Sequence, residues 1–207
     1  MIADRRARTL SRVVIAIDGP AGAGKSTVAR AVAERLGFTY LDTGAMYRAV
    51  GIAGPGSDPE ALEVGFDGPR VLLDGRDVTA RIRTPEASEA ASRVATDPRV
   101  RAALVRKQQA LLAKGNWVAE GRDIALVVAP QAEVKVFLTA EPRERARRRA
   151  EETGRSVDEV LAEQRDRDAR DATGDRTVDK PAPGAVELDT TGLGVDEVVQ
   201  RIVEMAR

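Results

Sequence analysis

The pattern of apolar and polar positions predicts a strand, a helix and a second strand in the first part of the chain. Residues 12–18, RVVIAID, form a continuous apolar run typical of a buried strand, whereas residues 25–37 carry the helical period and end at Gly37. Residues 38–42, FTYLD, predict a second short strand, and a short helix is expected over residues 43–54. This β-α-β order is typical of a parallel sheet covered by helices.

The pattern changes at residues 54–59, GPGSDP, a stretch rich in turn-forming residues and the clearest internal linker. Three short segments follow and predict a small antiparallel meander, at residues 61–66, 70–75 and 76–82. Asp74 ends an apolar run and so imitates the strand-end aspartate of a Walker B site. Because Gly75 follows it inside the meander, we interpret the two residues as a hairpin turn instead.

Beyond the meander, helices and strands alternate again. Helices are expected at residues 85–95, 98–115, 142–154, 156–171 and 194–207, and strands within residues 116–123, 132–140 and 185–191. Ser156 is placed to cap the helix that follows it, with Glu159 three residues on in the capping-box arrangement. Strands that alternate with helices predict a single α/β domain with a mainly parallel sheet covered on both faces.

Composition narrows the possible chemistry. The 207 residues include no His and no Cys, which excludes an imidazole base, a thiol nucleophile, a disulfide and a His/Cys zinc site. Phosphoryl transfer remains possible, because it depends on positioning, Mg²⁺ and cationic groups rather than on a strong base. The 33 basic residues balance 33 acidic ones, so no nucleic acid or membrane partner is expected. With no signal-peptide pattern and no run of transmembrane length, we expect a cytoplasmic protein.

Residues 19–26, GPAGAGKS, fit the pattern G-x-x-x-x-G-K-[ST] between a predicted strand and a predicted helix. In such a P-loop, backbone N–H groups surround the β-phosphate of a nucleotide, Lys25 reaches the β and γ oxygens, and the Ser26 hydroxyl ligates Mg²⁺. A glycine turn that only packs a helix on a sheet could share this spacing, but the flanking elements favour a nucleotide site. The predicted nucleotide-binding residues are Gly19, Pro20, Ala21, Gly22, Ala23, Gly24, Lys25, Ser26 and Thr27.

The second predicted strand runs into LDTGAMYR, residues 41–48. Strand carboxyl ends in a doubly wound sheet line the crevice where ligands bind, so Asp42 and Thr43 are expected beside the P-loop. Tyr47 and Arg48 lie one turn along the next helix. An aspartate that caps this helix, followed by a solvent-exposed arginine, would give the same pattern.

The segment AEGRD, residues 119–123, points to the same crevice. Gly121 permits a sharp turn at the end of a core strand, which would deliver Arg122 and Asp123 from a different part of the chain. Arg48 and Arg122 would then place two guanidinium groups at one cleft, which suggests a second phosphate site. We therefore expect a phosphoryl acceptor that is itself a phosphate ester.

The sequence does not decide the roles of the charged residues on two predicted helices. Arg145, Arg148 and Arg149 share one helix face, and belong either to a solvated helix laced by Glu pairs or to a mobile lid that closes over a triphosphate. Arg167 and Asp171, four residues apart, form either an ordinary ion pair or a pair that faces the substrate sugar.

Five segments together resemble the bacterial cytidylate kinases of the nucleoside monophosphate kinase superfamily. They are GPAGAGKST (19–27), LDTGAMYRAV (41–50), IRTPEASEAASRVATDPRVRAAL (82–104), VAEGRDI (118–124) and ELDTT (187–191), and the resemblance covers nearly all of residues 13–205. It implies a three-layer P-loop fold with a five-stranded parallel core sheet, a small antiparallel monophosphate-binding insert over residues 54–96 and a helical lid at about 142–175. Residues 1–53 and 97–207 would form the core of this single domain.

The resemblance also implies a reaction, in which ATP and Mg²⁺ convert CMP or dCMP to CDP or dCDP. A monomer is the default expectation, because the sequence does not give the oligomeric state. The implied catalytic residues are Lys25, Arg122, Asp123 and Arg148, with Ser26 on the metal. Arg48 and Arg122 would hold the acceptor phosphate, while Ser92, Arg101 and Asp123 would contact the cytosine edge. Asp42, Arg167 and Asp171 would hold the sugar, and Thr43 and Tyr47 complete the expected substrate-binding set.

The chain departs from the family pattern at Gly174, where an arginine is usual. We expect Arg176 to take over its lid contact; alternatively Arg176 is solvated and the three arginines of residues 145–149 suffice. Among other P-loop proteins, a GTP-operated switch would need an Asn-Lys-x-Asp stretch, which is absent, and a nucleic-acid motor would need a larger chain or a basic face. Another small-molecule kinase, such as an adenylate kinase, stays open because fold does not fix substrate.

Overall fold

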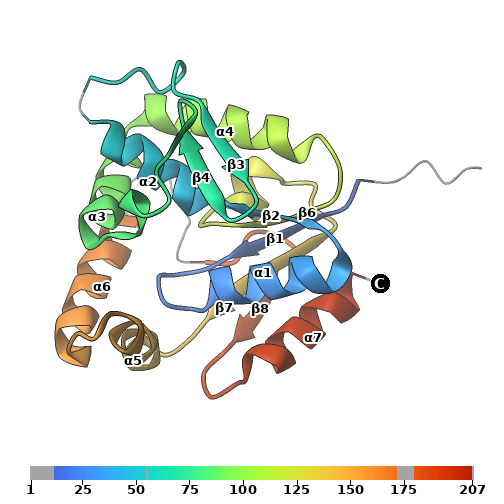
Figure 1. The fold of residues 1–207 in the computed structure, drawn as a ribbon. Coiled ribbons are helices and arrows are strands. Elements are labelled where there is room, and N and C mark those ends of the chain that lie inside the picture. The colour runs from blue at the N-terminus through green and yellow to red at the C-terminus, as the bar shows by residue number, and fades with distance from the viewer. Residues whose placement is uncertain (1–11, 55, 172–179, 207) are drawn as a thin grey trace, which may run out of the picture.

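The computed structural model describes residues 12–54, 56–171 and 180–206. Its core is a five-stranded sheet in which all neighbouring strands run parallel, which confirms the expected core (Figure 1). In order across the sheet the strands are β2 (Thr39–Asp42), β6 (Trp117–Glu120), β1 (Val14–Asp18), β7 (Val134–Thr139) and β8 (Val186–Asp189). Because the strands are parallel, the loops that follow β1, β2 and β6 all open at one edge of the sheet.

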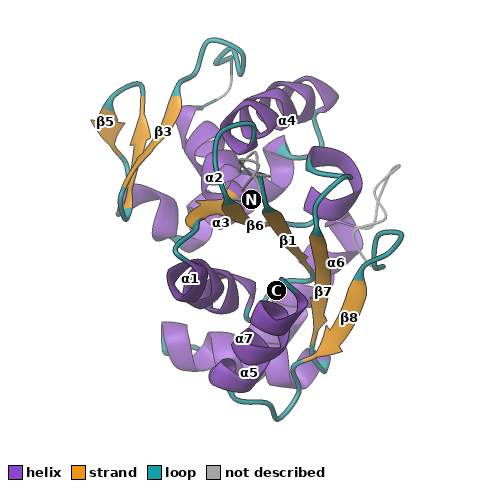
Figure 2. Ribbon diagram, turned by 90° about the vertical axis from the view of Figure 1, so that its right-hand side faces the viewer, coloured by secondary structure: helices purple, strands orange, loops and turns teal. Residues whose placement is uncertain are grey.

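Helices cover both faces of this sheet (Figures 1 and 2). One face carries α1 (Lys25–Leu36) and α7 (Val195–Met205), and the other α2 (Thr43–Ala53) and α4 (Pro98–Leu112). Alternate residues of β1 contribute to both layers, Ile15 and Ile17 to the first and Val14 and Ala16 to the second. Burial on both faces explains why this strand reads as a continuous apolar run.

The predicted meander is a separate three-stranded antiparallel sheet, which projects from the core near α4 (Figure 2). Its strands are β3 (Val64–Asp67), β4 (Arg70–Leu73) and β5 (Arg76–Asp77). Asp74 and Gly75 both have positive φ, 50° and 75°, as a two-residue hairpin turn requires, so their interpretation as a turn is confirmed. A 3₁₀ turn (Arg81–Arg83) and α3 (Pro85–Val94) then return the chain to the core, where α3 packs on α2.

Two further helices form a hairpin, α5 (Pro142–Thr153) and α6 (Val157–Asp171), which pack on each other through Ala146, Ala150 and Val160. The hairpin lies beside the strand ends, and α6 contacts α3. At the start of α6 the Ser156 hydroxyl accepts the N–H of Glu159 at 3.2 Å, as the capping-box pattern predicted.

Two elements were not predicted from the sequence. The third expected meander segment is a strand only over Arg76–Asp77 and continues into the 3₁₀ turn, and a turn of π-helix covers Ile124–Val128 directly after the loop that follows β6. Its side chains at Ile124, Ala125 and Val128 are buried in the layer formed by α2 and α4. Short π-helical turns occur frequently at functional sites, and this one begins one residue after Asp123.

Candidate functional site

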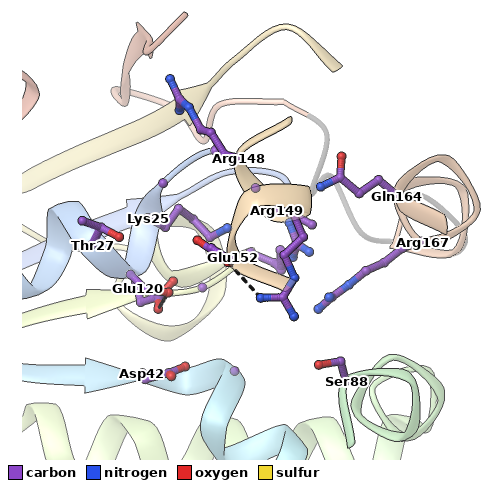
Figure 3. A pocket seen from close by; sticks show the side chains of 18 of the residues that line it. Lys25, Thr27, Asp42, Ser88, Glu120, Arg148, Arg149, Glu152, Gln164 and Arg167 are labelled. Atoms are coloured by element: carbon purple, nitrogen blue, oxygen red, sulfur yellow. Dashed lines mark hydrogen bonds and ion pairs between the residues drawn. The ribbon is translucent and has the colours of Figure 1, made fainter. Parts of the chain in front are cut away.

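A cavity of about 920 Å³ lies at the carboxyl ends of the strands, between the P-loop, α2, α3 and the α5–α6 hairpin (Figure 3). This is the edge of an α/β sheet where ligands usually bind. Most residues predicted from the sequence line it: Ala21, Gly22, Ala23, Gly24, Lys25, Ser26, Thr27, Asp42, Thr43, Tyr47, Arg48, Ser92, Arg101, Arg122, Asp123, Arg148 and Arg167. Gly19 and Pro20 belong to the P-loop but do not line the cavity.

Three cationic side chains donate hydrogen bonds to backbone carbonyls of the P-loop. Lys25 belongs to the loop itself, and Arg122 and Arg145 come from other segments. Three successive carbonyls each accept a hydrogen bond: Gly19 from Arg122 Nη1 (2.7 Å), Pro20 from Lys25 Nζ (2.8 Å) and Ala21 from Arg145 Nη1 (2.9 Å). Burial, followed by the nearby charge of Arg122, lowers the pKa of Lys25 to about 7. Lys25 and Arg122 are therefore close enough to act on one group of phosphate oxygens between them.

Glu120 is a site residue that sequence reasoning missed. It ends β6, is 5% exposed, and its Oε1 accepts hydrogen bonds from Ser26 Oγ at 2.5 Å and from Tyr40 Oη at 2.9 Å. Burial, and then the charge of Asp42, raise the pKa of Glu120, while Lys25 opposes them. The available signal was an acidic residue that ends an apolar strand before a glycine, the pattern we tested only at Asp74.

Asp18, at the end of β1, was also missed. It is 4% exposed, and its two carboxylate oxygens accept the backbone N–H groups of Ile124 at 2.9 Å and Ala125 at 2.8 Å. This contact fixes the start of the π-helix and with it the adjoining loop that carries Arg122 and Asp123. Burial raises the pKa of Asp18 to about 6, although both hydrogen bonds act in the opposite direction.

The raised pKa of Asp18 predicts a dependence of stability on pH. The folded-state pKa of about 6 exceeds the ordinary value, so the folded state binds the proton more tightly and this contribution to the unfolding free energy falls as pH rises from about 4 to about 6. We expect the unfolding free energy of wild-type protein minus that of Asp18→Asn to fall by about 2 kcal/mol over this window. Urea unfolding at several pH values measures it, and a difference independent of pH would contradict the prediction.

Asp42 caps a helix and Arg48 lines the cavity, so each of the two interpretations of residues 41–48 is correct in part. Asp42 Oδ1 accepts the N–H of Ala45 at 2.8 Å and so caps α2, as the alternative proposed. Its Oδ2 accepts a hydrogen bond from Arg48 Nη2 at 2.8 Å, and Arg48 lines the cavity with its side chain 24% exposed. The arginine is therefore turned toward the cavity rather than toward open solvent.

Ser92, Arg101 and Asp123 line the same cavity, although they come from α3, α4 and the loop after β6. We call these three residues the acceptor wall. Arg101 Nη2 and Asp123 Oδ2 form an ion pair of 2.6 Å. Ser92 is 5% exposed, and its Oγ has no hydrogen-bond partner among the described residues. A buried hydroxyl of this kind in a cavity wall is suited to a polar ligand edge.

Gly121 lies where the sequence placed it, but for a different reason. Its φ is outside the left-handed region, so the turn itself does not require glycine. A Cβ at this position would lie 2.7 Å from Ile124 Cδ1 and 2.7 Å from Thr43 Oγ1. Close packing of the two strand-end loops therefore excludes a side chain here.

The α5 arginines do not act as one set. Arg148 lines the cavity and donates to Glu144 and to both oxygens of Thr190, at 3.0 Å and 2.7 Å. Arg149 also lines the cavity, where it pairs with Glu152 at 2.9 Å (Figure 3). Arg145 is buried against the P-loop, which neither interpretation of the helix expected.

Arg167 is described, whereas Asp171, Gly174 and Arg176 are described only in part or not at all. Arg167 projects from α6 into the cavity (Figure 3). Asp171 ends α6, but its side chain lies outside the described residues, and so do Gly174 and Arg176. The expected lid contact of Arg176 therefore stays a prediction.

Comparison with known proteins gives a consistent result. A family model described as cytidylate kinase matches residues 15–207. A cytidylate kinase of Carboxydothermus hydrogenoformans is 47% identical over 92% of this chain and 96% of its own, and one of Solibacter usitatus is 46% identical over 95% and 93%. Among solved structures, a shikimate kinase from Acinetobacter baumannii superimposes with a TM-score of 0.52 at 17% identity, covering 95% of this chain and 93% of its own. That likeness extends to the fold alone.

Proposed function

The chain belongs to the cytidylate kinase family, and on this basis we propose that it transfers the γ-phosphoryl group of ATP to CMP and dCMP with the help of Mg²⁺. The observation that carries the proposal is one cavity lined both by the P-loop and by two arginines from other segments, Arg48 and Arg122. A P-loop binds the phosphates of one nucleotide, and a pair of guanidinium groups can bind the phosphate of a second substrate. Both substrates of a phosphate-to-phosphate transfer can therefore be held together.

The donor triphosphate is held by the backbone of the P-loop at the start of α1, with Lys25 on its β and γ oxygens. Lys25 and Arg122 exchange their present carbonyl partners for phosphate oxygens. The two cations then stabilise the negative charge that is shared between donor and acceptor during transfer. Arg148 contributes from the α5 side of the cavity.

Ser26 and Glu120 fit a magnesium ion. Their oxygens lie 2.5 Å apart at the edge of the P-loop, and hydroxyl and carboxylate oxygens are the ligands that Mg²⁺ prefers. The described residues contain no cluster of three acidic or other metal-ligating side chains, which agrees with an ion that relies on phosphate and water for its other ligands. When bound, the ion neutralises phosphate charge.

The base of the acceptor lies against Ser92, Arg101 and Asp123, and its phosphate lies between Arg48 and Arg122. Cytosine offers an amino group that donates and ring positions that accept. The carboxylate of Asp123 can accept from the amino group, while Arg101 and the unpartnered Ser92 hydroxyl can donate to the ring and carbonyl. Asp42, Arg167 and Asp171 hold the sugar.

A catalytic base is not needed for this reaction. The attacking oxygen belongs to a phosphate monoester, which is already largely deprotonated near pH 7. The protein has only to align the two phosphates and balance their charge. A chain without histidine or cysteine can carry this reaction with the arginines and the lysine of the cavity.

Further proposals concern the insert, the lid, the oligomeric state and the cellular location of the enzyme. We propose that residues 54–96 form the acceptor-binding insert, that residues 142–175 act as a lid, and that the enzyme works as a cytoplasmic monomer without a nucleic acid partner. Within the parts of the chain that the structure describes, no helix has the length and apolar character to cross a membrane.

The acceptor preference tests the proposal directly. In an assay coupled to ADP release, with ATP and one candidate acceptor at a time, we expect kcat/KM for CMP and dCMP to exceed that for AMP by about 100-fold or more, because a site built to hydrogen-bond cytosine leaves buried groups unpaired with other bases. UMP is expected between them, and shikimate is expected to be inactive. Faster turnover of AMP than of CMP would contradict the proposed function.

A further inference from the structure

Arg145 is the buried arginine of α5 and connects three segments. It is 7% exposed, its Nη1 donates to the carbonyl of Ala21 in the P-loop at 2.9 Å, and its Nη2 pairs with Asp168 Oδ2 of α6 at 2.9 Å. A guanidinium this deeply buried is costly unless its partners stay in place, and its loss would leave the partners unpaired. The contact therefore joins the P-loop to both helices of the hairpin.

Gln164 strengthens the same junction. It is 6% exposed, lines the cavity, and its Nε2 donates to the backbone carbonyl of Arg145 at 3.4 Å, while its Oε1 has no partner among the described residues. Figure 3 shows it projecting from α6 toward the side of the cavity that carries Lys25. Helix α6 thus reaches the P-loop through a polar side chain that lines the cavity.

The fit at Gly22 leaves no spare room. A Cβ at this position would lie 2.8 Å from Gln164 Nε2 and 2.9 Å from the Arg145 carbonyl, and the φ of Gly22 is 78°. A side chain here would be strained by the backbone conformation and would also push the hairpin away. The helices and the loop are therefore packed directly against each other at this residue.

The orientation of one peptide follows from the Arg145 contact. The peptide between Ala21 and Gly22 is planar and trans, so its N–H points opposite to its carbonyl. Because the carbonyl accepts from Arg145 Nη1, the N–H of Gly22 points away from that guanidinium. Lys25 and Arg122 hold the two preceding carbonyls, but both are proposed to serve the phosphates as well, whereas Arg145 is paired with Asp168.

We propose that Arg145, Asp168 and Gln164 form a clasp on Ala21 and Gly22 that orients the P-loop for the donor triphosphate and keeps the α5–α6 hairpin docked on it. The clasp residues are positioning residues, because they act on the phosphates through the backbone of the loop. This inference rests on the proposed function, since it takes the P-loop as the ATP site. It predicts a larger effect on ATP than on CMP, because the P-loop contact acts on ATP alone, whereas only Arg167 and Asp171 among the proposed CMP contacts come from α6.

The test compares Arg145→Met with the matched control Arg143→Met. Arg143 lies on the same helix and also faces an α6 aspartate, Asp158 at 3.8 Å, but its side chain is 75% exposed and is absent from the cavity wall. We expect Arg145→Met to raise the calorimetric Kd and the KM for ATP about tenfold or more, because a charged hydrogen bond to the loop is lost, and to change the KM for CMP by a clearly smaller factor. Arg143→Met should match wild type in both, and Arg145→Lys should restore part of the ATP affinity, because an ammonium can donate to Ala21.

Gln164→Met provides an independent readout if Arg145→Met does not fold. It keeps the side-chain volume but removes the amide, and we expect a several-fold weaker ATP affinity, with an unchanged CMP KM. Equal changes in the KM for ATP and CMP, or wild-type ATP affinity in Gln164→Met and Arg145→Lys, would overturn the clasp. A wild-type protein that fails to bind ATP would instead contradict the proposed function itself.

Discussion

Lys25→Ala is expected to lower kcat by about a thousandfold or more, equivalent to about 4 kcal/mol of transition-state stabilisation, while the protein stays folded. Lys25 is the P-loop cation, and its loss removes charge balance from the β and γ oxygens. We expect Lys25 to contribute little to the free energy of unfolding. Burial and the charge of Arg122 lower its pKa to about 7, which means that its charged form is destabilised in the ligand-free protein. The melting temperature should therefore stay equal to that of wild type or rise.

Lys107→Ala is the matched control for Lys25→Ala. The Nζ of Lys107 also donates to a backbone carbonyl, that of Glu60, at 2.8 Å, the same distance as from Lys25 Nζ to Pro20. Lys107 lies on α4 outside the cavity, so its variant should keep wild-type kcat. Coupled ADP release at saturating ATP and CMP measures both, and a Lys25→Ala enzyme within about tenfold of wild type would exclude the assigned role.

The core fold and the P-loop were predictable because their signals are local in sequence. Residues 12–18 are apolar throughout because β1 is covered on both faces, and the glycine pattern with Lys25 and Ser26 follows from the geometry of one turn. The Asp74–Gly75 turn could likewise be recognised from two neighbouring residues. Helix ends were less accurate: α4 ends at Leu112 rather than near residue 115.

Glu120, Asp18 and Arg145 could not be assigned in the same way, because their roles depend on which segments become neighbours. Parallel pairing places Glu120 opposite Asp42 of β2 and Ile17 of β1, and only this register brings it to Ser26. Asp18 acts on a π-helix that lies 106 residues later in the chain. Arg145 resembles its neighbours on a charged helix until the hairpin is docked on the P-loop.

Arg122→Ala is expected to lower kcat/KM for CMP by about a thousandfold, with ATP affinity within about threefold of wild type. Arg122 lines the cavity close to Lys25, and its planar guanidinium can hold an acceptor phosphate with two parallel hydrogen bonds. Its loss removes both binding and alignment of the attacking oxygen, so kcat and the KM for CMP should both deteriorate. Arg122→Lys should recover charge but not alignment, and so improve KM more than kcat.

The contact of Arg122 with the P-loop defines what would contradict this assignment. Its Nη1 donates to the Gly19 carbonyl at 2.7 Å, so the same substitution could act through the loop rather than through the acceptor. Calorimetry with ATP and CMP separately distinguishes the two, since an effect through the loop weakens ATP binding, whereas loss of an acceptor clamp weakens CMP binding alone. Arg201→Ala is the control, because Arg201 lies on α7 in an exposed pair with Glu197 at 2.7 Å, outside the cavity, and should leave both affinities unchanged.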